Sequence, residues 1–274
     1  NRFLNEINFI RYLYPLNLKI IPKLIGANET DGVAIFNYIN GHLHDRDQSI
    51  PSRYWQECIS FIETIQASEK LKGNIHLQSG SEAMFSIKNH MTALHARRDK
   101  WLNLAKNNLI DKALSQLITE KVEPAYQAVA RIILPLEGFN KTIGKEEQII
   151  SPSDLGLHNA LICKDSKDIT FIDFEYAGWD DPAKTLSDFY CQPTYPAPIK
   201  YVNKFYSSLQ KLIPENFRKD FNERLPYIFE IIRLKWCLIV LNPFLNNDQP
   251  SSKAIELAKN EIDRLLSLPQ PINS

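Results

Sequence analysis

The sequence lacks several features that define special classes of protein. Its four cysteines lie far apart and form no C-x-x-C pair, in a chain of 274 residues that is too long to need disulfides. They are expected to be buried thiols in a reducing compartment. Net charge is also absent, because 32 basic side chains balance 32 acidic ones, and no run of five basic residues occurs. The composition therefore predicts no nucleic-acid partner.

Long apolar runs and leader segments are missing as well. The most apolar stretch, residues 227–245, contains Glu230, Arg233 and Lys235, charges that a bilayer span tolerates poorly. No signal peptide opens the chain. These absences predict a globular, cytoplasmic protein with no membrane partner. Because Asn1 is not methionine and helical spacing follows at once, the chain is expected to be a piece of a longer protein.

The apolar residues that are present show helical spacing first and strand-like spacing next. Residues 3–14 have the spacing of an amphipathic helix, which Pro15 ends. Two short segments rich in isoleucine and valine, residues 19–26 and 33–39, predict a pair of strands. Pro22 indicates that the first of them is an edge strand.

The rest of the chain is mostly helical in pattern. Residues 51–133 and 182–266 carry apolar positions at helical spacing, and the strand-like residues 148–173 lie between them. Residues 41–49 are expected to be a short linker. The sequence therefore predicts an α+β fold, with a small strand-containing amino-terminal part and a large helical part that a hairpin interrupts.

The predicted hairpin contains the strongest candidate for a site. Ala160–Cys163 and Ile169–Ile172 are apolar segments separated by five polar residues, which predicts two antiparallel strands. If the hairpin is centred on Ser166, Asn159 and Asp173 are equally far from its tip and face each other at the open end. Facing residues have Cβ atoms about 5 Å apart, so an amide oxygen and a carboxylate can share one Mg²⁺ ion there.

A candidate base lies close by in the sequence. Asp154 precedes Asn159 by five residues, in a loop that contains Pro152 and Gly156. Its carboxylate can therefore approach the same place without belonging to the hairpin. Asp154 is therefore a candidate general base.

The pattern D-x-x-x-x-N, a short hairpin and an aspartate after an apolar strand resembles the catalytic and metal-binding loops of the protein-kinase-like superfamily. Ile172–Glu175, Asp181 with Pro182, and Asp188 resemble its aminoglycoside phosphotransferase and choline kinase branch. The resemblance implies a protein-kinase-like fold. Residues 1–40 would be a partial N-lobe of helix, strand pair and hinge, and residues 41–274 a mainly helical C-lobe.

The resemblance also implies an activity. Asp154 would position and deprotonate the acceptor hydroxyl, while Asn159 and Asp173 would hold Mg²⁺ on the phosphates of ATP or another nucleoside triphosphate. The chain would then be a small-molecule kinase that transfers the γ-phosphoryl group to a hydroxyl of a small metabolite. Phosphoryl transfer depends mainly on positioning and on charge neutralisation, which these residue types supply.

The same resemblance assigns the nucleotide contacts. Glu6 matches the glutamate that pairs with the ATP-binding lysine, and the backbone of Asn37, Tyr38 and Ile39 matches the hinge that contacts adenine. The glycine-rich loop and its lysine would lie upstream of Asn1. Pro152 and Ser153 stand where the family has histidine and glycine, so the support of the catalytic loop is expected to differ.

Simpler interpretations exist for several of these residues. Asp181 before Pro182 fits the start of a helix, Glu175 can bind metal or hold a loop, and Asp188 is expected to order the catalytic loop. A loop histidine such as His158 is more often structural than catalytic. Trp179 is expected in a loop, where it would line an acceptor pocket. Four basic residues of one helical stretch are expected to form a salt-bridged helix face: His90, His95, Arg97 and Arg98.

Two other functions remain open at this stage. One is a catalytically silent kinase-like module that binds a nucleotide or a partner, which the unusual Pro152 and the missing lysine favour. The other is a metal-dependent hydrolase, although the sequence has no H-x-H, H-E-x-x-H or dense aspartate motif. The sequence determines neither the acceptor nor the oligomeric state.

Overall fold

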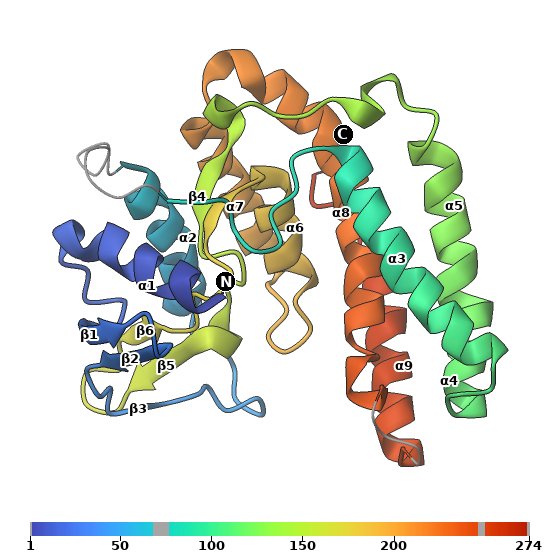
Figure 1. The fold of residues 1–274 in the computed structure, drawn as a ribbon, viewed down its shortest axis with the longest axis horizontal. Helices are drawn as coiled ribbons and strands as arrows, with labels where there is room; N and C mark the ends of the chain where they lie inside the picture. Colours follow the sequence, from blue (N-terminus) through green and yellow to red (C-terminus); the bar gives the residue numbers. More distant parts are fainter. Residues whose placement is uncertain (1, 68–76, 246–249, 273–274) are drawn as a thin grey trace. The chain divides into compact units, whose positions relative to one another are not determined.

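The computed structural model describes residues 2–67, 77–245 and 250–272 (Figure 1). The chain divides into two compact units. Unit 1 comprises Asn1–Met84 and Gly144–Lys219, and unit 2 comprises Phe85–Ile143 and Asp220–Ser274. All the candidate site residues belong to unit 1. The lobe boundary expected at residue 40 stays a prediction.

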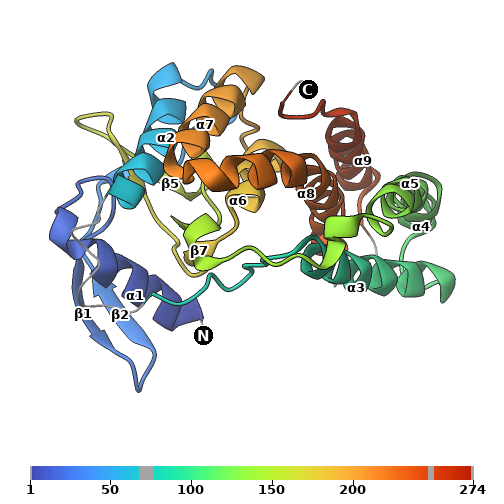
Figure 2. The same ribbon diagram turned by 90° about the horizontal axis from the view of Figure 1, so that it is seen from above.

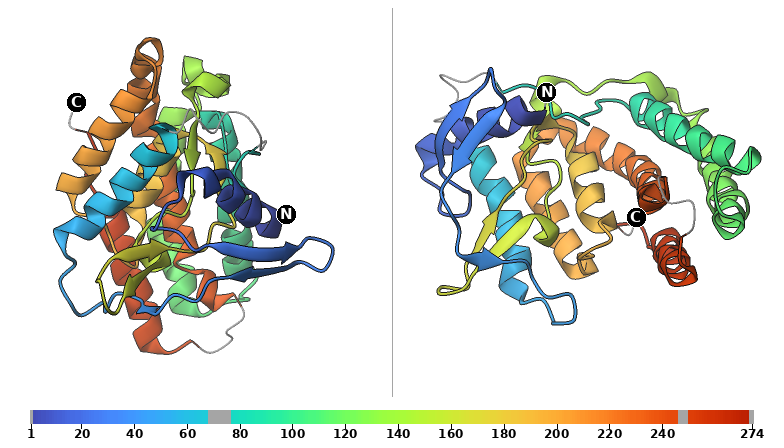
Figure 3. Two further views of the ribbon diagram at one scale, coloured as in Figure 1. Left: turned by 90° about the vertical axis from the view of Figure 1, so that its left-hand side faces the viewer. Right: turned by 60° about the horizontal axis from the view of Figure 1, so that its bottom comes forward.

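Unit 1 begins with the predicted helix and strand pair. Helix α1 (Arg2–Leu13) lies alongside β1 (Leu24–Asn28), which pairs antiparallel with β2 (Val33–Phe36), as Figure 3 shows. The strand predicted over residues 19–26 is wrong up to residue 23. Pro22 has no N–H group, so this segment cannot continue a regular ladder.

The predicted linker contains a short strand. Strand β3 (Gly41–His42) pairs with β5 (Ala160–Cys163), which also pairs with β6 (Ile169–Phe171), and both pairs are antiparallel. A Cβ atom at Gly41 would come within 2.9 Å of the Ile162 carbonyl oxygen, so only glycine fits without a shift. The linker prediction is therefore wrong at its first two residues, which fasten the hairpin to the amino-terminal segment.

A second pair of strands brackets the loop region of the candidate site. Strands β4 (Ile149–Ser151) and β7 (Gly178–Asp180) are antiparallel. Residues 78–80 run along β7, because the Trp179 N–H donates to the Gln78 carbonyl at 3.0 Å and the Trp179 carbonyl accepts from Gly80 at 3.0 Å. Trp179 thus lies in a strand, and its placement in a loop was wrong.

Three helices complete the described part of unit 1. Helix α2 (Ser52–Ala67) lies side by side with α7 (Ile199–Leu212), as Figure 2 shows, and the rings of Trp55 and Tyr201 stack between them with centroids 6.1 Å apart. Helix α6 (Pro182–Cys191) is buried along its whole length. Burial on all sides makes α6 a fixed platform for neighbouring loops.

Unit 2 is helical throughout its regular structure. The predicted helical segments are confirmed in the helices given below, but residues 77–86 are not helical, and residues 68–76 and 246–249 of the predicted segments lie outside the described residues. A π-helical turn, Ile118–Val122, joins two of the helices. The helices are α3 (Ile87–Lys106), α4 (Lys112–Leu117), α5 (Glu123–Ile133), α8 (Arg218–Ile239, which starts in unit 1) and α9 (Ser252–Ser267).

The cysteines and the helix lengths bear on two further predictions. Cys58, Cys191 and Cys237 are buried free thiols, as predicted, whereas Cys163 is only half-buried. Burial raises the pKa of the Cys237 thiol to about 12. Among the helices that the structure describes, none has both the length and the apolar character needed to cross a bilayer.

Candidate active site

The hairpin forms as predicted, but its register differs by one position. Ala160 faces Phe171, and the Ile172 N–H donates to the Asn159 carbonyl at 2.9 Å. Asn159 therefore faces Ile172, and Asp173 follows one residue beyond. The prediction assumed a turn of five residues centred on Ser166. The turn contains four residues, 164–167, so the centre of the hairpin lies between Asp165 and Ser166. The Asn159 amide and the Asp173 carboxylate are therefore not directly opposite each other but are offset by one residue at the open end of the hairpin.

Two residues of the site have a left-handed backbone. Asp173 has φ of 65° and Ser153, just before Asp154, has φ of 66°. This conformation costs a residue with a Cβ atom about 1 kcal/mol or more. The other three such residues in the described chain, Asn17, Asn108 and Lys167, lie in turns. Strain that persists in the two site loops indicates that surrounding contacts fix their geometry.

The Asp154 side chain is held by two neighbours in its own loop. His158 Nε2 lies 3.0 Å from Asp154 Oδ1, and Asn159 Nδ2 donates to Asp154 Oδ2 at 3.3 Å and to its carbonyl at 3.1 Å. The carboxylate remains 35% exposed. His158 is therefore placed to orient the Asp154 carboxylate, and its role stays a prediction.

Gly156 makes room for this arrangement. A Cβ atom there would come within 2.6 Å of His158 Nδ1, far inside van der Waals contact. The Gly156 backbone is extended at φ 175°, so its conformation does not require glycine. The requirement for glycine comes from the close approach of the His158 ring alone.

Negative charge accumulates around Asp173. Burial raises the pKa of the Asp173 carboxyl, and the charges of Glu175 and Asp154 raise it further. Burial also raises the pKa of Glu6 on α1, a hydrogen bond from the Phe174 backbone opposes this shift, and the charges of Asp173 and Glu175 add to it. Four carboxylates thus share one region, a distribution that favours a bound cation.

This crowding predicts that Glu6 destabilises the folded chain at neutral pH. Because its folded pKa lies above the unfolded value of about 4.3, its ionisation opposes folding once the pH rises past that value. Glu6→Gln is therefore expected to have a larger free energy of unfolding than the wild type at pH 7 and an equal one at about pH 4. Urea denaturation at both pH values measures this difference. A Gln variant that is less stable at pH 7 would contradict the prediction.

Glu175 lies in a set of contacts that the sequence did not indicate. Arg2 Nη1 lies 3.2 Å from Glu175 Oε1, and the Arg2 guanidinium is 4.5 Å from the centre of the Tyr176 ring. Ser81 Oγ donates to the Glu175 carbonyl at 3.1 Å and accepts from Asn5 at 2.8 Å. Of its two predicted roles, these contacts favour holding the loop.

A buried ion cluster lies beneath the Asp154 loop. Lys184 Nζ lies 2.7 Å from Asp180 Oδ2, 3.2 Å from Asp188 Oδ2 and 2.9 Å from Ser153 Oγ. Burial lowers the pKa of Lys184, but the two carboxylates outweigh it, so the pKa lies above the usual lysine range. Burial raises the pKa of Asp180, the charge of Lys184 opposes this shift, and the charge of Asp188 adds to it. The sequence analysis missed Lys184.

Helix α6 and its N-cap contain two residues whose structural roles were predicted, Asp181 and Asp188. Asp181 is the N-cap, with its carboxylate accepting from the Ala183 N–H at 2.8 Å, and Pro182 occupies the first turn. Asp188, expected to order the catalytic loop, binds Lys184. Asp188 therefore contacts the catalytic loop indirectly, through Lys184, which binds Ser153 of that loop.

The predicted hinge follows β2 and precedes β3. Asn37 Oδ1 accepts from the Lys23 N–H at 2.5 Å, and the backbone of Asn37 also donates to the Lys23 carbonyl, so this residue closes the β1–β2 pair. Tyr38 is 87% exposed. Within the described chain, the N–H groups of Tyr38 and Ile39 have no backbone acceptor. The contact of these residues with adenine stays a prediction.

The basic helix face predicted in unit 2 is salt-bridged at Arg98 and His95, whereas the prediction is wrong for His90, which is buried. Arg98 binds Glu123 through two nitrogens and also binds Asp99 at 2.8 Å, while His95 lies 2.8 Å from the Tyr126 hydroxyl. These contacts connect α3 to α5. They account for Arg98 and His95 without a substrate.

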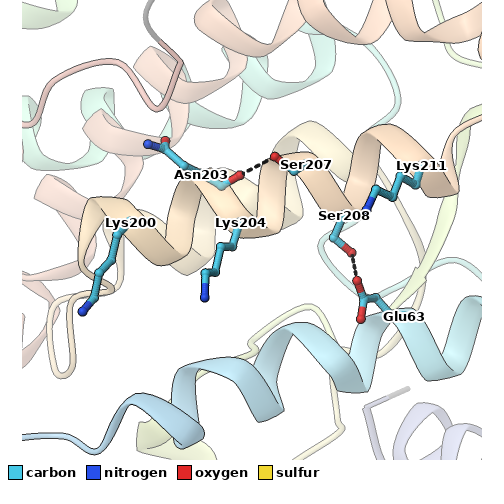
Figure 4. A pocket seen from close by; sticks show the side chains of 7 residues that line it. All are labelled: Glu63, Lys200, Asn203, Lys204, Ser207, Ser208 and Lys211. Atoms are coloured by element: carbon cyan, nitrogen blue, oxygen red, sulfur yellow. Dashed lines mark hydrogen bonds between the residues drawn. The ribbon is translucent and has the colours of Figure 1, made fainter.

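A groove on unit 1 lies apart from the predicted site residues. It has a volume of about 350 Å³ and lies between α2 and α7 (Figure 4). Lys200, Lys204 and Lys211 of α7 line it together with Glu63 of α2, which accepts a hydrogen bond from Ser208 at 2.7 Å. The groove contains no carboxylate pair and none of the candidate catalytic residues.

Comparisons with known proteins identify the fold. No protein-family model matches the chain, and no curated protein matches its sequence. A structure of spectinomycin phosphotransferase with ADP and spectinomycin is similar at a TM-score of 0.58, with 11% identity and coverage of 96% of this chain and 82% of that chain. The choline kinase LicA from Streptococcus pneumoniae is similar at 0.54, with 12% identity and coverage of 98% and 81%.

A third similar structure is the choline kinase from Cryptosporidium parvum, with a TM-score of 0.52, 16% identity, and coverage of 95% of this chain and 76% of that chain. The chain has a protein-kinase-like fold. The α+β class and the fold expected from the motif are thereby confirmed. In this protein-kinase-like fold, the hairpin β5–β6 and the loop before it bring Asp154 and Asn159 into contact, with Asp173 within electrostatic reach.

Proposed function

We propose that the protein is a small-molecule kinase that transfers the γ-phosphoryl group of ATP, or of another nucleoside triphosphate, to a hydroxyl of a small metabolite. The observation that carries the proposal is the Asp154 carboxylate, oriented by His158 and Asn159 and electrostatically coupled to Asp173. The fold supports it, because proteins named as spectinomycin phosphotransferase and choline kinase share that fold.

Asp154 is the base in this proposal. Its exposed carboxylate accepts the proton of the acceptor hydroxyl, whose oxygen bonds to the γ-phosphorus. The bond from that phosphorus to the β–γ bridging oxygen breaks, and the nucleoside diphosphate leaves. His158 and Asn159 hold the carboxylate in one orientation, so less ordering is needed at the transition state.

Asn159 and Asp173 fit a magnesium site. Because Asn159 Nδ2 donates to Asp154, the amide oxygen is the atom of this side chain left to bind a hard cation. Burial and, after it, the charges of Glu175 and Asp154 raise the pKa of Asp173, and a bound cation would favour its ionised form. Bound Mg²⁺ would neutralise charge on the phosphate oxygens. Among the residues that the structure describes, no group of three or more His, Cys, Asp or Glu side chains could hold a metal, so water and phosphate oxygens would complete the coordination.

The nucleotide would lie against the hinge. The N–H groups of Tyr38 and Ile39 and the carbonyl of Asn37 are the groups proposed to contact adenine. Glu6 of α1 accepts a hydrogen bond from the Phe174 backbone and lies within electrostatic reach of Asp173, which supports its proposed pairing with a phosphate-binding lysine. A catalytically silent module with the same contacts would bind nucleotide without transferring phosphate.

A product assay distinguishes these two functions. The full-length protein is incubated with ATP, Mg²⁺ and a library of hydroxylated small molecules, and phosphorylated products are detected by mass spectrometry. One chemical class of acceptor should gain a phosphoryl group, and removal of Mg²⁺ with EDTA should abolish the gain. Thermal stabilisation by Mg²⁺ and ATP without any product would support the silent module and reject the proposal.

Gly156→Ala is expected to lower the transfer rate by about tenfold to a hundredfold. The new methyl group displaces the His158 ring, to which its three nearest atoms belong, and Asp154 then loses one of its two orienting contacts. Steady-state kinetics measure the loss. In a His158→Ala background, Gly156→Ala should have no further effect, since the displaced ring is already absent. Independent, multiplying losses would contradict this explanation.

A further inference from the structure

Lys184 is a buried cation that contacts the loop carrying Asp154. It lies in the first turn of α6 and is 3% exposed. Its ammonium group has three N–H bonds and three acceptors, two of which are the carboxylates of Asp180 and Asp188. The third acceptor is the Ser153 hydroxyl at 2.9 Å. A charge this deeply buried requires fixed partners, so the position of Ser153 is fixed as well.

Ser153 is a residue whose conformation needs support. Its left-handed backbone is unfavourable for serine, and it directly precedes Asp154. The Ser153 hydroxyl accepts from Lys184 and donates to Asp180 at 3.2 Å, so both of its hydrogen-bonding roles are used. The Ser153 N–H donates to Ser151 Oγ at 2.9 Å. These contacts are made to the end of β4, the end of β7 and the start of α6.

We propose that Lys184 is a positioning residue for Asp154, which it holds in place through the hydroxyl of Ser153. Asp154 is then fixed from two directions. His158 and Asn159 orient its carboxylate, while Lys184 and Ser153 fix the backbone that carries it. Lys184 does not touch the reacting atoms in this proposal. The expected effect of Lys184 on catalysis rests on the proposed function. Its expected effect on the rigidity of the Asp154 loop does not.

The direct test removes the hydroxyl and leaves the ion cluster in place. Ser153→Ala keeps Lys184 between its two carboxylates, so the folded structure should survive. We expect kcat to fall at least tenfold, the KM for ATP to change less than twofold, and amide hydrogen exchange in residues 151–159 to accelerate at least tenfold. A general loss of stability would instead accelerate exchange throughout unit 1.

Ser187→Ala is the matched control. Ser187 is a buried serine of α6, the helix that carries Lys184, but its hydroxyl donates to the Ala183 carbonyl at 2.7 Å and not to the Asp154 loop. It should leave kcat and exchange of residues 151–159 unchanged. If Ser153→Ala behaves like Ser187→Ala in both measurements, the inference is wrong.

Lys184→Met tests the lysine itself. Combined with Ser153→Ala, it should lower kcat per folded molecule no further than Lys184→Met alone, because both changes break the same connection. Losses that multiply would overturn the proposed route through Ser153. If the wild type transfers no phosphate, the proposed function fails, and hydrogen exchange still decides the inference: faster exchange confined to residues 151–159 in Ser153→Ala supports it, and unchanged exchange rejects it.

Discussion

Asp154→Asn is expected to lower the rate of phosphoryl transfer by about 10²- to 10⁴-fold, the usual contribution of a general base. Asparagine has the shape of aspartate, so the loop and its contact with His158 should persist. An amide cannot accept the hydroxyl proton, however, and the transition state loses its proton acceptor. The loss should appear in kcat, and the KM for ATP should change little, because Asp154 is not assigned to the nucleotide.

The matched control for this experiment is Asp168→Asn. Asp168 is an exposed aspartate in the turn between β5 and β6, and the same chemical change there should leave the rate within a factor of two. Both variants are compared by steady-state kinetics on the acceptor found in the product assay. Equal rates for Asp154→Asn and the wild type would remove Asp154 from the mechanism and, with it, the main support for the proposed function.

The arrangement of Asp154 and Asn159 was predictable because local pattern determines it. Two apolar segments separated by a short polar run are a strong local signal for a hairpin, and the D-x-x-x-x-N spacing brings the two side chains together across one loop. The exact register was not predictable in the same way. The polar run has five residues, but the turn uses four, and the sequence does not distinguish an odd turn from an even one.

Lys184 was not predictable from the sequence, for a different physical reason. The spacing of apolar residues in α6 indicates an amphipathic helix, and on such a helix a lysine is expected in solvent. In the structure all ten residues of α6 are buried, because other elements cover its polar face as well. Asp180 and Asp188 lie four residues before and after Lys184, so the local sequence does contain the two ion-pair partners. The local sequence does not show that other elements bury this group, or that Ser153, 31 residues away, supplies the third acceptor.

Lys184→Met is expected to lower the free energy of unfolding by about 3–5 kcal/mol, since it leaves two buried carboxylates without their cation. The methionine side chain is similar in length to that of lysine, so lost packing contributes little to the change in stability. Lys204→Met on α7, where the lysine is exposed, is the control and should change the stability by less than about 0.5 kcal/mol. Urea denaturation at pH 7 measures both values.

The destabilisation of Lys184→Met should depend on pH in a defined direction. Burial already raises the pKa of Asp180 in the wild type, and without Lys184 the main influence that opposes this shift is lost, while the hydrogen bond from the Asp181 N–H remains. The folded variant then binds more protons than the unfolded chain above the ordinary aspartate pKa of about 3.9, so its stability falls as the pH rises through the raised folded pKa. The loss relative to the wild type should therefore be smaller at pH 5 than at pH 7, and Asp180→Asn added to Lys184→Met should recover part of it at pH 7. An identical loss at both pH values would show that the two carboxylates do not depend on Lys184 for their charge.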